Sequence, residues 1–184
     1  MHQGVIIADK TGHDGRVILR EVRGEDFATL AEMRRDREMQ SLLLTVPEAT
    51  DDAAVRGWIE RRCAEAGGGF RVIADAATDA AVGYAQVSQV HRRNRVGYGG
   101  IALARSARGR GFGRASLWLL VDYAGRELGL TKMLSEIRAD NEAALKMNYA
   151  VGFRPVGLID QHFRDVDATY DVVLLQRHLN GDGS

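Results

Sequence analysis

The stretch that decides the fold is Ile101-Ala-Leu-Ala-Arg-Ser-Ala-Arg-Gly-Arg-Gly-Phe-Gly-Arg-Ala115. Its apolar run ends at Ala104, and three glycines follow at alternate positions, Gly109, Gly111 and Gly113. Arginines surround these glycines, and a long amphipathic helical pattern begins directly after them. Glycines let backbone N–H groups approach a ligand closely, and the N-terminus of a helix attracts negative charge. The stretch therefore predicts a strand, a turn able to cradle a diphosphate, and a helix.

Three phosphate-binding motifs contain glycines in a turn of this kind. A P-loop needs Lys and then Ser or Thr after its last glycine, but Arg114-Ala115 follows Gly113 here. A Rossmann fingerprint needs G-x-G-x-x-G after the first strand of a βαβ unit, whereas this chain has G-x-G-x-G after a series of strands. The third motif, Arg-x-x-Gly-x-Gly, is filled by Arg108, Gly111 and Gly113. Taken alone, these glycines serve tight packing as readily as ligand binding.

The composition is that of one globular domain. The 184 residues are 45% hydrophobic with 2 prolines, and 25 basic minus 25 acidic residues gives a net charge of zero. Cys63 is the single cysteine, which excludes an internal disulfide and a cysteine cluster for zinc. We therefore expect one domain over residues 1–184 with its core at about 16–176. We expect no metal, nucleic-acid or membrane partner, and a cytoplasmic location, since no basic leader or long apolar run is present.

Hydrophobic periodicity predicts the order strand, two helices, three strands, helix, strand, helix, two strands. Asp26 is the expected N-cap of the first helix, and Arg34–Glu48 are expected to form a loop after it. This order is typical of an α/β fold with a largely antiparallel central sheet flanked by helices. The predicted ranges are Val17–Val22, 26–35, 50–66, Phe70–Ala74, Ala81–Val90, Arg95–Ala104, 112–128, Met133–Ala139, Asn141–Val151, Arg154–Ile159 and Tyr170–Leu175.

A second motif lies thirty residues beyond the glycine turn: Asn141-Glu-Ala-Ala-Leu-Lys-Met-Asn-Tyr-Ala-Val-Gly-Phe153 reads as an Asn-led helix that ends in Gly-Phe. The two motifs and the element order resemble the GNAT superfamily of acetyl-CoA-dependent N-acetyltransferases, from Val17 to about Leu175. The subgroup that it most resembles includes the ribosomal-protein, spermidine and amino-sugar N-acetyltransferases.

The resemblance implies acetyl-CoA as cosubstrate. Amides of the glycine turn would hold the diphosphate, backbone groups of the preceding strand would run beside the pantetheine arm, and two asparagines of the later helix would help hold that arm. The residues implied are Ile101, Ala102, Leu103, Arg108, Gly109, Arg110, Gly111, Phe112, Gly113, Arg114, Asn141 and Asn148.

The resemblance implies Glu136 as general base, because some relatives carry a glutamate five residues before the motif's Asn. Tyr98 is the second catalytic candidate, placed where other relatives have a glutamate and expected to line the acceptor pocket. His91 has a suitable unperturbed pKa but lies in an expected hairpin turn. Many relatives have an acid tyrosine where this chain has Asn148. Cys63 has no paired histidine, and packing is its expected role.

The implied function is acetyl transfer to a primary amine by direct attack in a ternary complex. The acceptor is left open among an amino sugar, a polyamine and a peptide N-terminus. We expect the first two helices and the loop Arg34–Glu48 to contact it. Two alternatives remain at this point: a non-catalytic acyl-CoA-binding module and a nucleotide-binding domain of Rossmann type. A homodimer is compatible with the sequence, because the strand Tyr170–Leu175 could pair across a dimer or lie inside the sheet.

Overall fold

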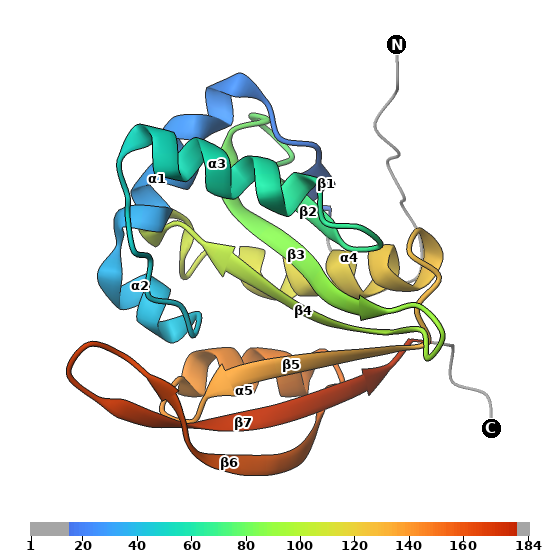
Figure 1. Ribbon diagram of the computed structural model, residues 1–184. Coiled ribbons are helices and arrows are strands. Elements are labelled where there is room, and N and C mark those ends of the chain that lie inside the picture. The colour runs from blue at the N-terminus through green and yellow to red at the C-terminus, as the bar shows by residue number, and fades with distance from the viewer. Residues whose placement is uncertain (1–14, 180–184) are drawn as a thin grey trace.

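The computed structural model describes residues 15–179, and its strands form one sheet in the order β1-β2-β3-β4-β5-β7-β6 (Figure 1). Neighbouring strands run antiparallel except β4 and β5, which are parallel. The α/β class and the largely antiparallel sheet expected from the sequence are confirmed. The strands are β1 (Val17–Arg20), β2 (Gly69–Asp75), β3 (Ala81–His91), β4 (Val96–Leu103), β5 (Lys132–Arg138), β6 (Arg154–Arg164) and β7 (Thr169–His178).

Helices cover both faces of this sheet. On one face α1 packs on β3 and α3 packs on β2, while α4 packs on β1, β3 and β4 from the other face and contacts α5 (Figure 1). The core between these layers includes Trp58, Phe70 and Tyr84, whose rings lie 5.1–5.5 Å apart. The helices are α1 (Phe27–Arg35), α2 (Arg37–Leu42), α3 (Asp52–Cys63), α4 (Phe112–Arg126) and α5 (Glu142–Ala150), with 3-10 turns η1 (Gly24–Asp26) and η2 (Arg105–Ala107).

The start of α1 differs from the prediction. Asp26 occupies the N-cap position, but its side chain accepts no capping hydrogen bond from the helix. Its carboxylate instead accepts two hydrogen bonds of 2.8 Å from the Arg20 guanidinium and one of 2.7 Å from the Arg23 amide. Asp26 is 1% exposed, and its buried carboxylate bonds the charged Arg20 guanidinium, which is a stronger hydrogen-bond donor than a helix amide.

Two further ranges were predicted wrongly. Residues 34–48 contain the helix α2, whose N-terminus is capped by Asp36, where a loop was expected. Strand β6 continues to Arg164 rather than ending at Ile159, because it pairs with β7 beyond a register shift. Of the two positions left open for Tyr170–Leu175, the structure has the internal one, since β7 pairs with β5 on one edge and β6 on the other.

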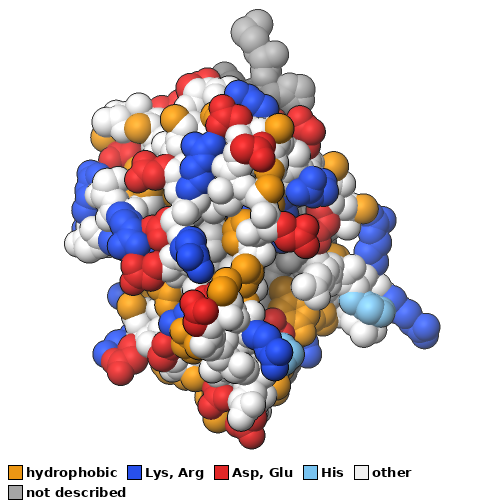
Figure 2. All heavy atoms as spheres, turned by 60° about the vertical axis from the view of Figure 1, so that its left-hand side comes forward, with side chains coloured by type: hydrophobic (Ala, Val, Ile, Leu, Met, Phe, Trp, Pro, Cys, Tyr) orange, Lys and Arg blue, Asp and Glu red, His pale blue; other side chains and the backbone are white. Residues whose placement is uncertain are grey.

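The surface is mixed in charge. On the face brought forward in Figure 2, basic and acidic side chains alternate without a large area of one sign. Within residues 15–179, no helix combines the length and the apolar character needed to cross a bilayer.

Candidate active site

The two parallel strands at the centre of the sheet separate along their length. Strands β4 and β5 pair only from Val96 to Tyr98, opposite Lys132 to Leu134, and then diverge (Figure 1). Beyond Tyr98, β4 keeps its pairing with β3 as far as Leu103. Within residues 15–179 its other edge has no strand partner from Gly99 to Leu103, so backbone groups that point there can bond an extended ligand. We call the space between the diverging strands the β4–β5 opening.

Two consecutive glycines of β4, Gly99 and Gly100, differ in what surrounds them. A Cβ atom at Gly99 would lie 2.5 Å from the Met133 sulfur, so this glycine lets β4 cross the core residue of β5. At Gly100, by contrast, a Cβ would meet nothing within 4 Å. Packing therefore requires the first glycine and not the second, which leaves free space beside the strand at Gly100.

A cavity of about 320 Å³ occupies the β4–β5 opening. Of the predicted site residues, it brings together Glu136, Tyr98, Ile101, Asn141 and Asn148, which come from β4, β5 and α5. Ala102 and Leu103 lie further along β4, and Ala102 is buried. The remaining predicted residues, 108–114, belong to the glycine turn and the start of α4.

The glycine turn leaves the N-terminus of α4 without a side-chain cap. Gly111 takes the N-cap position with φ +81°, a left-handed conformation that favours glycine. The first amides of this fifteen-residue helix are thus available to an anion, where the helix dipole also attracts negative charge. Gly113 has a packing reason as well, since a Cβ there would lie 2.9 Å from the Met147 sulfur.

The arginines of the turn differ in availability. Arg110 pairs with Asp75 at 3.3 Å and lies over the Phe112 ring at 4.5 Å, so its charge is partly engaged inside the protein. Arg108 donates to the Leu103 carbonyl at 3.4 Å. Arg114 is exposed and makes no ion pair with residues 15–179. Arg114 is therefore the arginine of the turn whose charge is most available to a bound phosphate.

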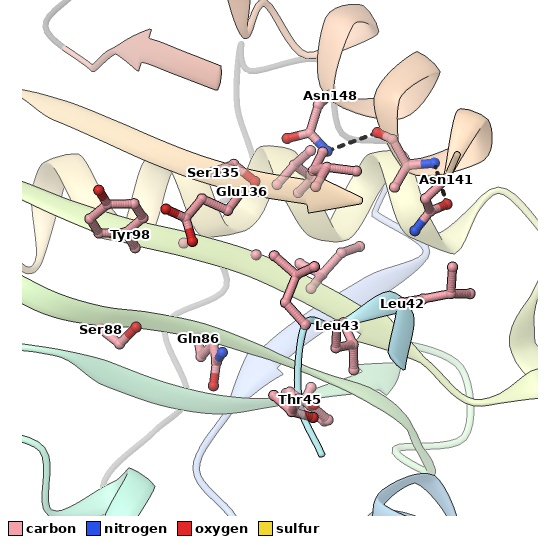
Figure 3. Close-up of a pocket in the computed structure, with 18 of the residues that line it drawn as sticks. Leu42, Leu43, Thr45, Gln86, Ser88, Tyr98, Ser135, Glu136, Asn141 and Asn148 are labelled. Carbon is pink, nitrogen blue, oxygen red and sulfur yellow. Dashed lines mark hydrogen bonds between the residues drawn. The ribbon is translucent and has the colours of Figure 1, made fainter. Parts of the chain in front are cut away.

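Helix α5 contributes two asparagines with different duties. Asn141 caps the helix, and its Oδ1 accepts from the Ala144 amide at 3.2 Å, as its sequence position predicted. Asn148 is 4% exposed; its Nδ2 donates to the Ala144 carbonyl at 2.9 Å, while its Oδ1 has no hydrogen-bond partner in the structure (Figure 3). A buried acceptor without a partner costs about 1–3 kcal/mol. Because Asn148 lines the cavity, a ligand N–H could satisfy that oxygen.

The cavity holds one carboxylate. Glu136 on β5 points into the β4–β5 opening on the side of Tyr98 (Figure 3). Within residues 15–179 it makes no ion pair and no hydrogen bond through its carboxylate. A carboxylate with free lone pairs in a cavity can accept a proton from a bound group.

Neither alternative nucleophile or base lies in the cavity. His91 is exposed at the end of β3, and its Nδ1 accepts from the Asn94 amide at 3.2 Å. Cys63 is exposed at the end of α3, so the packing role expected for it is wrong. Burial of part of the side chain raises the pKa of the Cys63 thiol, which disfavours the nucleophilic thiolate.

Sequence reasoning missed the wall of the cavity opposite α5. This wall includes Arg34 from α1, Trp58 from α3 and Tyr84 from β3. Burial raises the pKa of the Tyr84 phenol to about 12, so it stays protonated at neutral pH. The first two helices and the loop at 34–48 were expected to contact the acceptor, but the sequence alone does not separate Arg34, which lines the cavity, from the exposed Arg35.

Comparison with known proteins defines the class of this domain. The family model for the acetyltransferase (GNAT) domain matches residues 16–154. The chain therefore belongs to the GNAT acetyltransferase domain family, as its two motifs predicted.

Individual relatives are more distant. The N-alpha-acetyltransferase RimI of Mycobacterium tuberculosis (strain ATCC 25618 / H37Rv) is 36% identical over 85 residues, 45% of this chain and 51% of that protein. An uncharacterised protein of Mycobacterium leprae (strain TN) is 34% identical over 101 residues, 54% of this chain and 26% of that protein. The chain thus spans between a quarter and a half of the length of these relatives.

Among solved structures, the spermidine N-acetyltransferase of Vibrio cholerae in complex with CoA and spermine has a TM-score of 0.82 and 18% sequence identity. The match covers 90% of this chain and 97% of that chain. At this identity the likeness establishes the shared fold.

Proposed function

We propose that this protein transfers the acetyl group of acetyl-CoA to a primary amine, by direct attack within a ternary complex. The observation that carries the proposal is the β4–β5 opening, an unpaired strand edge that ends near an uncapped helix N-terminus. An extended pantetheine arm matches the free edge, and a diphosphate matches the amides of α4. The Vibrio cholerae protein with this fold binds CoA.

The donor side uses mainly backbone groups. The free edge of Ile101, Ala102 and Leu103 pairs with the amide groups of the pantetheine arm, and the unpartnered Asn148 oxygen accepts one of its N–H groups. Asn141 stands at the start of the same helix beside the arm. The diphosphate binds the amides of the turn and the start of α4, namely Gly109, Arg110, Gly111, Phe112, Gly113 and Arg114. Arg108, whose amide donates to the Arg105 carbonyl at 3.3 Å, adds the charge of its side chain.

The reaction needs a neutral amine. Glu136 takes the proton of the incoming ammonium, directly or through water, and Tyr98 forms the adjoining wall of the acceptor pocket. The amine then attacks the thioester carbonyl, and an N–H of the free β4 edge stabilises the oxyanion. Collapse of the tetrahedral intermediate breaks the C–S bond and expels the CoA thiolate, which takes up the proton that the amide nitrogen loses. A thiol with an ordinary pKa of about 8.5 can leave without a tyrosine acid, which fits Asn148 at that position.

Thermal shift and thiol release test this proposal together. CoA is expected to raise the melting temperature where NAD does not, since a ligand that binds only the folded state stabilises it. Acetyl-CoA with a panel of amino sugars, polyamines, aminoglycosides and peptides is expected to release free CoA. Stabilisation by CoA with no turnover on any amine would favour the acyl-CoA-binding module, and stabilisation by NAD alone would favour the nucleotide-binding domain.

A further inference from the structure

Arg34 lines the cavity from α1. Its Nη1 donates to the Gln40 side-chain oxygen at 2.7 Å, and its guanidinium lies 5.0 Å from the centre of the Trp58 ring. Within residues 15–179, no Asp or Glu oxygen lies within 4.0 Å of it. By contrast Arg20 and Arg138, two other largely buried arginines, each pair with an aspartate. The charge of Arg34 is therefore not balanced by the protein.

The surroundings hold the Arg34 guanidinium in place. Gln40 is 1% exposed, and its Nε2 donates to the Met33 carbonyl at 2.9 Å, which fixes the amide. The Gln40 oxygen also accepts from the Thr45 hydroxyl at 2.8 Å. Trp58 packs edge-on against two further aromatic rings of the core. A guanidinium has five N–H donors, and among residues 15–179 only one of those of Arg34 has an acceptor.

The other charges near this end of the cavity are also positive or already paired. Arg62 lines the same wall and pairs with Glu65 at 3.3 Å. Burial lowers the pKa of Arg34, and the charges of Arg62 and Arg61 lower it further. Glu136 is the carboxylate that lines the cavity, and it comes from β5, whereas Arg34 and Arg62 come from α1 and α3. The cavity thus presents a proton acceptor on one wall and a surplus of positive charge on another.

We propose that the acceptor amine also carries an anionic group, a carboxylate or a phosphate, which pairs with Arg34 while the amine lies at Glu136. This inference rests on the proposed acetyl transfer and specifies its substrate class. The planar fork of an arginine binds either anion through two parallel hydrogen bonds, which would use donors that are free in this structure. A polyamine would place a second cation against Arg34 and is disfavoured.

Matched pairs of amines that differ in the anionic group test this substrate class. One arm compares amino acids with their amides, a second compares phosphoethanolamine with ethanolamine, and spermidine serves as the cationic reference. We expect CoA release to show at least about tenfold higher kcat/KM for the anionic member of one pair. The pair that shows this preference tells whether Arg34 binds a carboxylate or a phosphate. Equal or better turnover of the neutral members, or of spermidine, overturns the proposal.

Variants then assign the preference to Arg34. Arg34→Gln is expected to raise KM for the anionic acceptor at least about tenfold, with kcat and the affinity for CoA little changed. Arg34→Lys keeps the charge and is expected to recover part of the loss. Arg35→Gln is the matched control on the next residue of α1, exposed and pointing to Asp52, and is expected to change neither constant. An equal effect of Arg34→Gln on both members of a pair contradicts the assignment.

Failure of the underlying acetyl transfer gives a different result. In that case no amine of any class releases CoA, although CoA still stabilises the protein. Thermal shift of the CoA complex with the same amine pairs then decides the binding preference. Stabilisation by the anionic member that is lost in Arg34→Gln supports the anion site, and its absence for both members overturns it.

Discussion

The glycine turn allows a sharp test of where the diphosphate binds. Gly111 caps the N-terminus of α4 at φ +81°, and Gly129 follows the C-terminal end of the same helix at φ +66°. Both are left-handed, so valine at either position is strained by on the order of 1–2 kcal/mol. Only Gly111 lies where the turn would meet a ligand. Gly111→Val and Gly129→Val therefore impose a similar backbone strain and differ in their position relative to the proposed site.

The expected magnitudes follow from the contacts at each position. A Cβ at Gly111 would lie 2.8 Å from the Arg16 Nη1, whose hydrogen bond to the Arg110 carbonyl is 3.1 Å long. Displacing that exposed bond adds about 0.5–1.5 kcal/mol to the loss of stability. A Cβ at Gly129 would meet nothing within 4 Å. In the complex, loss of one amide-to-phosphate hydrogen bond costs about 1.5–3 kcal/mol, which weakens CoA binding roughly 10- to 150-fold.

Isothermal titration with CoA measures the affinity, and urea unfolding measures the stability of each variant. Gly129→Val is expected to lose stability and keep the wild-type affinity. Gly111→Val is expected to lose slightly more stability and at least about tenfold in affinity. If the two variants bind CoA equally well, the diphosphate does not lie at this turn and the reasoning is refuted.

Three further predictions concern the β4–β5 opening and the core. Glu136→Gln is expected to lower kcat by roughly 10²- to 10⁴-fold with unchanged affinity for CoA, and an unchanged kcat in steady-state assays would exclude Glu136 as base. Gly100→Ala is expected to keep or slightly raise the melting temperature while raising KM. Gly99→Ala is expected to lower the melting temperature, because its Cβ would lie 2.5 Å from the Met133 sulfur. A lower melting temperature for Gly100→Ala than for Gly99→Ala would contradict the described packing. Burial raises the pKa of Asp26, but its hydrogen bonds to Arg20 and to a backbone amide outweigh this and lower it overall. The stability that Asp26 contributes is thus present above its unfolded pKa of about 3.9 and is lost as the pH falls through the lower folded pKa. Asp26→Asn is therefore expected to lower the free energy of unfolding by about 3 kcal/mol at pH 7. Urea unfolding measured against pH is expected to show a weaker loss of stability in acid for this variant than for the wild type.

The sequence predicted the elements whose pattern is local. The glycines of the turn and the Asn-led helix were placed correctly because caps and turns depend on a few neighbouring residues. Helix α2 was missed because six residues show little periodicity, and its N-cap Asp36 serves equally well in a loop. The end of β6 was missed because its exposed residues follow no hydrophobic alternation, and pairing with β7 decides its length.

The same distinction applies to the candidate site. Glu136 and Asn148 were named from the family resemblance, and both line the cavity. Asp26 was predicted to cap α1 because a cap depends only on neighbouring residues. Its actual partner, Arg20, lies on the preceding strand, and the sequence does not show that the two side chains meet. Arg34 was not separated from Arg35 because the choice between cavity and solvent depends on α3, which packs against α1 only after folding. Roles set by tertiary neighbours are not readable from local spacing.

The divergence of β4 and β5 also bears on how the protein holds together. Across the middle of the sheet only three residue pairs join the strands β1–β4 to the strands β5–β7. The two groups of strands are therefore linked mainly by α4 and the core rather than by a continuous ladder. A ligand that bonds the free edge of β4 and contacts α5 would connect the strands β1–β4 to the strands β5–β7. It would take the place that a strand would occupy beside β4. Occupancy of the opening is therefore expected to raise the midpoint of unfolding, because the ligand binds only the folded state.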